Sequence, residues 1–286
     1  MKNNIAVIGL GSMGYGIATS CLRSGHLVWG VDTNIDQVKA FCSQGGQATT
    51  LNSVIDKIDV VVVVVLNSVQ TEEVLFGQEG LVENLKPGTV VISCATVAPT
   101  FAIDMERRCK EFEIFYLDAP ISGGALKAKN GQLSIMASGV KEAFQHARPT
   151  LDSISETVFE LGDEAGTGSA MKSVNQLLAG VHIAVMAEAL TFGISQGISP
   201  DKFVEVISKC AGTSWMLENR APHIVNGDYK PHSSINIWPK DLGIVLDVAL
   251  ESKFNAPIAT AALEQFRTAV DMGLGFEDDA AVAKVY

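Results

Sequence analysis

The stretch that decides the fold lies at the start of the chain, where an apolar run enters a glycine-rich turn: Ile5-Ala6-Val7-Ile8-Gly9-Leu10-Gly11-Ser12-Met13-Gly14. A helix-compatible stretch from Tyr15 to Ser24 follows, and a second apolar run, Leu27 to Val31, ends in Asp32. This is the order strand, G-x-G-x-x-G turn, helix, strand, which opens a βαβ unit. A glycine turn without a ligand is the alternative, and the acid that ends the second run argues against it.

Each glycine of the turn has its own physical purpose. Gly9 permits a tight turn, Gly11 lets backbone N–H groups approach a pyrophosphate, and Gly14 lets the helix pack close to the strand. The N-terminus of that helix faces the anion. Asp32 follows Gly9 by 23 residues, close to the usual ~20 at which a carboxylate accepts hydrogen bonds from ribose hydroxyls. The whole turn, Gly9, Leu10, Gly11, Ser12, Met13 and Gly14, is therefore predicted to bind a dinucleotide together with Asp32.

Asp32 also indicates which dinucleotide is bound. The 2′-phosphate of NADP would face this carboxylate and be repelled, and the next residues, Thr33 and Asn34, provide no arginine to hold it. The sequence predicts NAD as the cofactor.

Composition limits the partners of the chain. It has 286 residues, 47% of them hydrophobic, and a formal net charge of −11. Such an acidic surface argues against nucleic acid and anionic membranes as partners. It also means that an anionic small-molecule substrate needs a local basic pocket. Each lysine or arginine near the site is therefore a candidate for binding it.

Cysteine usage and hydropathy predict the compartment. The five cysteines are scattered without a C-x-x-C and form no ligand cluster with the five histidines, so we expect free thiols, a reducing cytosol and no metal. The first strand begins too early for a signal peptide. Val60 to Leu66 is apolar but too short to span a bilayer, and it reads as a buried parallel strand. A soluble cytoplasmic protein is expected.

Strand and helix patterns alternate as far as about Gly162, which predicts an α/β fold with an N-terminal Rossmann-type, doubly wound, mostly parallel sheet. The strand candidates are Ile5–Gly9, Leu27–Asp32, Asp59–Leu66, Thr89–Cys94, Ile114–Asp118 and Gln132–Ala137. The helix candidates are Met13–Ser24, Ile35–Gln44, Ser68–Phe76, Pro99–Phe112 and Lys141–Ser155.

The pattern changes to helical spacing near Gly166. A long apolar helix is predicted from Ser169 to Gln196, as the spine of a second domain or as a subunit contact. Ser199 is a predicted N-cap, with Pro200 at the first helical position. We expect an NAD-binding domain over residues 1–163 and an all-helical substrate and oligomerisation domain over residues 164–286. The crevice between two such domains is the expected ligand site.

Two lysines compete for the role of proton-transfer residue. Lys172 lies near the start of the long apolar helix, where burial and the positive helix end would both lower its pKa. Asn175 and Gln176 share its helix face. Lys240 lies beside Asp241, which could orient it or form a surface pair with it. A snorkelling lysine at the domain edge is the alternative for Lys172.

A loop after a predicted strand offers a place for a carboxylate. It reads Asp118-Ala119-Pro120-Ile121-Ser122-Gly123-Gly124. The hydroxyl of Ser122 and the unobstructed N–H groups of Gly123 and Gly124 would form a small anion nest. A plain glycine turn is equally compatible with this stretch.

Four motifs together resemble the β-hydroxyacid dehydrogenases over essentially the whole chain. These are the Gly9–Gly14 turn, the Asp118–Gly124 loop, Gly166-x-Gly168-x-x-x-Lys172 and Lys240-Asp241-Leu242. That family includes 3-hydroxyisobutyrate dehydrogenase and tartronate semialdehyde reductase. The resemblance implies a Rossmann domain, a helical domain that assembles into homodimers or homotetramers, and a lysine acid/base.

Site roles follow from the resemblance residue by residue. It makes Lys172 the proton-transfer residue and places the substrate carboxylate on Ser122, Gly123 and Gly124. Other matching positions are Thr96 near the nicotinamide, Leu66 and Asn67 on the adenosine side, Lys240 as a contribution of the second domain to the cofactor and substrate, and Asn175 and Gln176 orienting the substrate hydroxyl.

One position departs from the family pattern. The family usually has Asn four residues after the catalytic lysine, whereas this chain has Gln176, which reaches one methylene further. With the stretch Gly212 to Arg220, this resembles the L-threonate dehydrogenase branch, which oxidises four-carbon sugar acids with NAD. The alternatives are 3-hydroxyisobutyrate dehydrogenase, tartronate semialdehyde reductase or, in another class, a non-catalytic NAD-binding sensor.

Several polar residues of the second half have ordinary structural interpretations. Arg220 could bind a carboxylate or pair with Glu218, Trp238 could wall the substrate or pack, and His182 is expected in a core or interface. The acidic run Glu277-Asp278-Asp279 reads as a solvated helix start.

Overall fold

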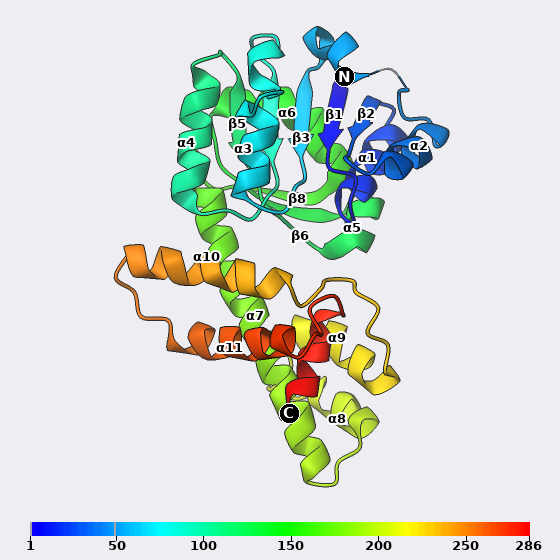
Figure 1. The fold of residues 1–286 in the computed structure, drawn as a ribbon, viewed down its shortest axis with the longest axis vertical. Coiled ribbons are helices and arrows are strands. Elements are labelled where there is room, and N and C mark those ends of the chain that lie inside the picture. Colours follow the sequence, from blue (N-terminus) through cyan, green and yellow to red (C-terminus); the bar gives the residue numbers. More distant parts are fainter. Residues whose placement is uncertain (1, 49) are drawn as a thin grey trace. The chain divides into compact units, whose positions relative to one another are not determined.

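The computed structural model describes residues 2–48 and 50–286 and divides into two compact units (Figure 1). Unit 1 is Met1–Lys172 and unit 2 is Ser173–Tyr286. The division falls inside one helix, α7 (Thr167–Ser195). The sequence placed a domain boundary nine residues earlier, at the end of the alternating pattern, whereas the first turns of α7 pack with unit 1.

Unit 1 contains a parallel sheet with the order β2-β1-β3-β4-β5 among its described residues. Its strands are β1 (Asn4–Ile8), β2 (Leu27–Val31), β3 (Val60–Val63), β4 (Val90–Ser93) and β5 (Phe115–Asp118). The helices of unit 1 are α1 (Gly14–Arg23), α2 (Ile35–Ser43), α3 (Ser68–Phe76), α4 (Pro99–Lys110), α5 (Gly124–Asn130) and α6 (Lys141–Ile154). Short 3₁₀ turns are η1 (Leu51–Ser53), η2 (Ile55–Lys57) and η3 (Val82–Asn84).

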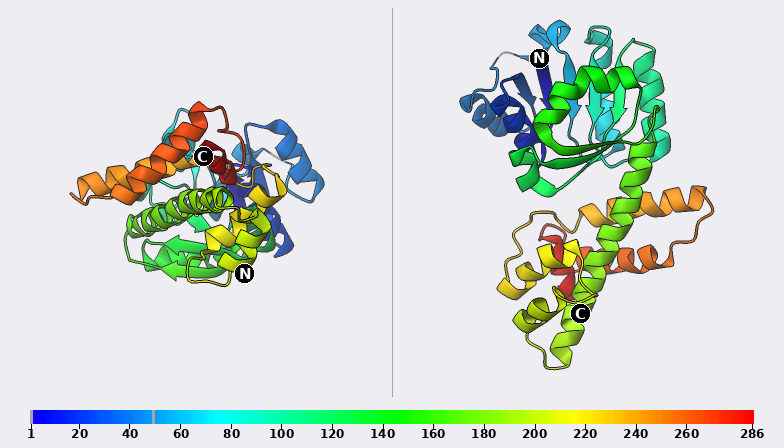
Figure 2. Two further views of the ribbon diagram at one scale, coloured as in Figure 1. Left: turned by 90° about the horizontal axis from the view of Figure 1, so that it is seen from below. Right: turned by 180° about the vertical axis from the view of Figure 1, so that it is seen from behind.

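The sheet is buried on both faces, which explains its unbroken apolar strands. Alternate residues of β3 enter two different cores: Val60 and Val62 join the cluster that contains α1 and α6, and Val61 and Val63 join the cluster that contains α3 and α4. Helices cover both faces in Figures 1 and 2. The predicted Rossmann-type, doubly wound sheet is confirmed.

A second small sheet was not expected from the sequence. It has the order β6-β7-β8, with β6 (Ile121–Ser122) antiparallel to β7 (Leu133–Ala137) and β8 (Ser155–Glu160) parallel to it. The predicted strand Gln132–Ala137 therefore exists, but its assignment to the main sheet was wrong. The two-residue β6 and the seven-residue α5 are too short to give a periodic signal.

Unit 2 is helical, as predicted. It contains the rest of α7 and then α8 (Pro200–Ile207), α9 (Trp215–Asn226), α10 (Ile237–Glu251), α11 (Pro257–Asp271) and the 3₁₀ segment η4 (Asp279–Val285). The predicted Ser199 N-cap is confirmed, since its side chain accepts a hydrogen bond from Lys202 N. Ile183, Met186 and Leu190 of α7 lie in the core of this unit with Trp238 and Phe266, whose rings stack at 5.4 Å.

Candidate active site

The glycines of the N-terminal turn differ in whether the fold leaves room for a side chain. A Cβ at Gly9, which has φ +94°, would lie 2.3 Å from Val64 O, and one at Gly14 would lie 1.8 Å from Gly9 O. Gly11 has no described neighbour within 4 Å of a Cβ position. The fold itself therefore requires Gly9 and Gly14, whereas the space at Gly11 is left for something outside the chain, as a pyrophosphate would need.

Asp32 is held at the end of β2 by two backbone N–H groups. Leu10 N donates to its Oδ2 at 2.6 Å and Asn34 N donates to its Oδ1 at 2.7 Å. The carboxylate thus lies beside the glycine turn, and α1 begins there without an acidic residue in its first turn. A carboxylate has about four lone-pair positions, so two hydrogen bonds leave acceptor capacity for ribose hydroxyls.

The other predicted cofactor residues of unit 1 lie at the same edge of the sheet. Leu66 and Asn67 follow β3, where Asn67 caps α3 by accepting from Gln70 N at 2.9 Å. Thr96 follows β4 and is half-buried. Since β1 to β4 run parallel, their carboxyl ends meet at one edge, where open α/β sheets bind ligands.

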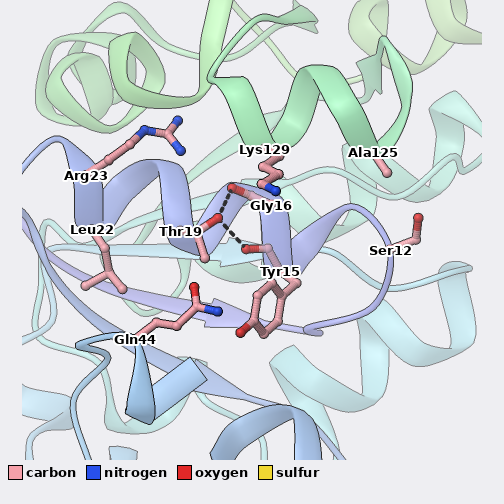
Figure 3. A pocket seen from close by; sticks show the side chains of 9 residues that line it. All are labelled: Ser12, Tyr15, Gly16, Thr19, Leu22, Arg23, Gln44, Ala125 and Lys129. Atoms are coloured by element: carbon pink, nitrogen blue, oxygen red, sulfur yellow. Dashed lines mark hydrogen bonds between the residues drawn. The ribbon is translucent and has the colours of Figure 1, made fainter. Parts of the chain in front are cut away.

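A hollow of about 560 Å³ lies beside this turn, along one side of α1 (Figure 3). It is lined by Ser12, Tyr15, Gly16, Thr19, Leu22, Arg23, Gln44, Ala125 and Lys129. The Thr19 hydroxyl lies within it and donates to Tyr15 O and Gly16 O, both at 3.0 Å. Of the predicted site residues only Ser12 reaches this hollow, so it is distinct from the strand-end edge.

Asp118 ties the predicted substrate loop to the start of α7, a role that the sequence did not reveal. It ends β5, is 1% exposed, and accepts hydrogen bonds from Gly166 N (2.9 Å), Ser169 N (2.8 Å) and Ser169 Oγ (2.6 Å). It thereby satisfies N–H groups at the start of the helix, which have no partner within the helix itself. Burial raises the pKa of Asp118, while these hydrogen bonds oppose the rise.

Lys172 is buried and points back to the same loop. Its side chain is held where Nζ donates to Ile121 O at 2.9 Å, and the residue is 7% exposed. Ser122, Gly123 and Gly124 follow Ile121 directly, and both glycines have positive φ (131° and 77°). The predicted catalytic residue and the predicted carboxylate nest are thus neighbours, through a backbone contact that spacing alone cannot show.

The predicted polar residues of unit 2 form a chain of side chains. Asn175 Nδ2 donates to Gln176 Oε1 at 2.9 Å, Gln176 Nε2 donates to Asp241 Oδ2 at 2.5 Å, and Lys240 Nζ pairs with Asp241 Oδ1 at 2.7 Å. Asp241 is 2% exposed. The sequence noted Asp241 only as a neighbour of Lys240, and its link to Gln176, 65 residues away, had no local signal.

The structure decides between the alternatives for Arg220 within the chain and corrects one expectation for the second half. Arg220 pairs with Asp279 and not with Glu218: its Nε donates to Asp279 Oδ1 at 2.5 Å, whereas Glu218 accepts from Thr213 Oγ1. Asp278 and Asp279 are not solvated but fully buried. Asp278 caps η4, and Asp279 also accepts from Trp238 Nε1 at 3.0 Å. Trp238 packs in the core, and His182 is half-buried on α7.

The cysteines are free thiols in the described structure. Burial raises the pKa of Cys21 to about 11 and that of Cys94 to about 12, so both stay protonated at neutral pH. Residues 2–48 and 50–286 contain no group of three or more His, Cys, Asp or Glu side chains placed to hold a metal ion.

Comparison with known proteins decides the family. Residues 4–162 match the NAD binding domain of 6-phosphogluconate dehydrogenase, and residues 166–286 match the NAD-binding domain of NADP-dependent 3-hydroxyisobutyrate dehydrogenase. The chain is 46% identical to L-threonate dehydrogenase of Cupriavidus necator, covering 100% of this chain and 97% of that protein. The chain belongs to the β-hydroxyacid dehydrogenase family.

Other members support the same placement. L-threonate dehydrogenase of Escherichia coli K12 is 42% identical over 99% of this chain and 94% of its own length. The crystal structure of 3-hydroxyisobutyrate dehydrogenase from Salmonella typhimurium has a TM-score of 0.93 and 40% identity, covering 99% of both chains. This β-hydroxyacid dehydrogenase is therefore an NAD-binding oxidoreductase, which excludes the non-catalytic sensor.

Proposed function

We propose that this dehydrogenase oxidises L-threonate, a four-carbon sugar acid, to its 2-oxo product with NAD as the acceptor. The choice of substrate is supported by the similarity to L-threonate dehydrogenases at 42–46% identity over nearly the whole chain. The observation that carries the reaction type is the buried amine of Lys172, 2.9 Å from the backbone of the loop that ends in Ser122–Gly124.

The chain's own residues supply acid–base chemistry and a grip on the acid. Ser122, Gly123 and Gly124 hold the substrate carboxylate with a hydroxyl and backbone N–H groups. Lys172, in its neutral form, takes the proton from the substrate hydroxyl as the C–H electron pair leaves with the hydrogen as hydride. NAD, when bound, supplies the nicotinamide that accepts that hydride. Asn175 and Gln176 orient the hydroxyl.

The cofactor contacts follow the strand-end edge of unit 1. Gly9 to Gly14 hold the pyrophosphate, Asp32 the ribose, Leu66 and Asn67 the adenosine side, and Thr96 the nicotinamide. The family resemblance assigns Lys240 to cofactor and substrate binding as well. The Asp32 carboxylate disfavours a 2′-phosphate, so NADH should bind more tightly than NADPH; tighter NADPH binding in a fluorescence titration would contradict this assignment.

A second candidate substrate comes from the comparisons. One similar crystal structure is of a 3-hydroxyisobutyrate dehydrogenase, and tartronate semialdehyde reductase is a further member of the family. A site with hydrogen-bond partners for extra hydroxyls rejects a methyl-bearing acid strongly, whereas an apolar site does not. The test is kcat/KM with NAD for L-threonate, D-glycerate and 3-hydroxyisobutyrate. We expect L-threonate to be the best substrate, and a higher kcat/KM for 3-hydroxyisobutyrate would replace the proposal.

Homo-oligomer formation through α7 completes the proposal. Large apolar side chains on this helix are exposed in the single chain at helical spacing, namely Met171, Val174, Leu178, Val185 and Phe192. By length and composition α7 could also cross a membrane, but its start is capped by Asp118 and its other face packs in the unit 2 core. We assign the stripe to a second copy in the cytoplasm. Leu178→Asp should shift the species seen by light scattering to monomer, whereas an unchanged mass would remove the stripe from the interface.

A further inference from the structure

We propose that Asp241 is a positioning residue that fixes which atom of Asn175 faces the substrate, and thereby sets the preference for a hydroxylated acid. This inference rests on the proposed function. Its basis is the chain of side chains from Lys240 through Asp241 and Gln176 to Asn175, all within unit 2.

The direction of each hydrogen bond in this chain follows from Asp241. Its Oδ1 forms an ion pair with the Lys240 ammonium at 2.7 Å, without hydrogen-bond geometry. A carboxylate only accepts hydrogen bonds, so Oδ2 is an acceptor toward Gln176. The Gln176 atom that lies 2.5 Å from Oδ2 must therefore be the amide nitrogen. Because a carboxamide carries its oxygen and nitrogen on opposite sides, Gln176 must then present Oε1 to Asn175.

The same logic passes to the next amide. Gln176 Oε1 accepts from Asn175 Nδ2 at 2.9 Å, which commits the Asn175 nitrogen. Asn175 Nδ2 keeps a second N–H, and the other polar atom of this amide is Oδ1, an acceptor. Asn175 and Gln176 lie three and four residues after Lys172, on the same face of α7. The acceptor is thus held on the helix face of the proton-transfer lysine, where a substrate hydroxyl can donate to it.

Burial makes this orientation matter. Asp241 and Gln176 are 2% and 7% exposed, so neither can exchange its partner for water at low cost. The length of Gln176 also allows its contact with Asp241, and a shorter Asn would lose reach by one methylene. A hydroxylated acid satisfies the fixed acceptor, whereas an acid with a methyl at that place leaves it unpaired.

The experiment is a double-mutant cycle. The quantity measured is the discrimination, defined as the ratio of kcat/KM for L-threonate to kcat/KM for 3-hydroxyisobutyrate. Asp241→Asn can present either oxygen or nitrogen to Gln176, so discrimination should fall about tenfold, as for the loss of one oriented hydrogen bond. Gln176→Glu sets two carboxylates against each other and should lower it about tenfold or more.

The double variant Gln176→Glu with Asp241→Asn provides the decisive arm. The new amide at position 241 donates to the new carboxylate at position 176, whose other oxygen still accepts from Asn175 Nδ2. Discrimination should therefore return to within about threefold of wild type, a recovery that simple loss of packing cannot produce. A double variant no better than the weaker single variant overturns the inference. Asp247→Asn, an exposed carboxylate on the same helix α10, is the matched control.

Urea unfolding of the same four proteins separates this inference from the proposed function. Destabilisation by Gln176→Glu that is relieved in the double variant shows the contact itself, whatever the substrate. If wild type oxidises L-threonate but Asp241→Asn keeps full discrimination, the inference fails and the function stands. If wild type oxidises neither acid while the contact is seen in unfolding, the proposed function fails, and with it the specificity role of Asp241.

Discussion

The two units build their candidate sites from different materials. Unit 1 uses backbone: glycines at 9, 11, 123 and 124, strand-end loops, and carboxylates that accept from main-chain N–H groups. Unit 2 uses side chains that hold one another: Asn175–Gln176–Asp241–Lys240 in its candidate site and, in the same manner, Arg220–Asp279–Trp238 in its core. Backbone sites depend on local chain geometry, whereas side-chain networks depend on long-range packing. Substitutions should therefore fail differently in the two units.

The largest expected effect belongs to Lys172, where the units join. Lys172→Ala removes the proton acceptor and should lower kcat by about 10²–10⁴-fold, the usual contribution of general acid–base catalysis. NAD affinity should change little, because the strand-end contacts remain. Steady-state kinetics and a fluorescence titration measure both, with Lys141→Ala, an exposed lysine at the start of α6, as control. Near-normal turnover in Lys172→Ala would remove this lysine from the mechanism.

Removing one partner of the buried ion pair between Arg220 and Asp279 in unit 2 should strongly destabilise the fold. Asp279→Ala leaves the Arg220 guanidinium buried with the more distant Asp278, 4.0 Å away, and takes the acceptor from Trp238. The free energy of unfolding should fall by about 3–5 kcal/mol, with NAD affinity unchanged in the folded protein. Glu218→Ala, at the exposed partner of Thr213, should cost under about 0.5 kcal/mol in urea unfolding. Equal costs would contradict the assigned pairing.

This contrast explains what the sequence could and could not predict. The β1 turn, the long helix and Lys172 carry local signals: glycine spacing, apolar periodicity and position after a Gly-x-Gly. The burial of Asp279 carries none, because its partner Arg220 lies 59 residues earlier in the chain. From the sequence alone, a run of three acidic residues is interpreted as solvent-exposed. Only the folded structure shows that a buried cation lies beside it. The short β6 and α5 were missed because two and seven residues are too few for periodicity.

In the glycine turn Gly9–Gly14 of unit 1, one glycine should matter for stability and another for ligand binding. Gly14→Ala places a Cβ 1.8 Å from Gly9 O and should cost about 1–3 kcal/mol of stability or more, as overpacking does. Gly11→Ala meets no described atom within 4 Å and should keep stability within about 1 kcal/mol. Its NAD affinity should nevertheless fall at least about tenfold, because the methyl group occupies the pyrophosphate approach. Unfolding and calorimetric titration of both variants test this, and unchanged NAD affinity in Gly11→Ala would mean that the cofactor lies elsewhere.

The smallest effect is the change with pH in the contribution of Asp118 to the free energy of unfolding. This carboxylate links the end of β5 to the start of α7. Burial raises its pKa above 3.8, so ionisation is less favourable in the folded chain than in the unfolded one. Its stabilising contribution is then fully present below about pH 3.8 and is lost as pH rises through the raised folded pKa. Asp118→Asn keeps an acceptor oxygen but cannot ionise. The free energy of unfolding of wild type, minus that of Asp118→Asn, should fall across this window. Above the window it should be flat.

Urea unfolding from pH 4 to 8 measures this difference, and Asp56→Asn, which removes an exposed carboxylate of unit 1, is the control. A difference that rises with pH would mean that the hydrogen bonds from Gly166, Ser169 and Ser138 outweigh burial, so that the start of α7 stabilises the negative charge more than water does. Backbone N–H groups and serine hydroxyls, without a cation, would then be enough to make a buried carboxylate stabilising. In that case Asp118 and Asp279 would both stabilise the fold as carboxylates. They would differ only in their partners, because Asp279 lies against a full cation.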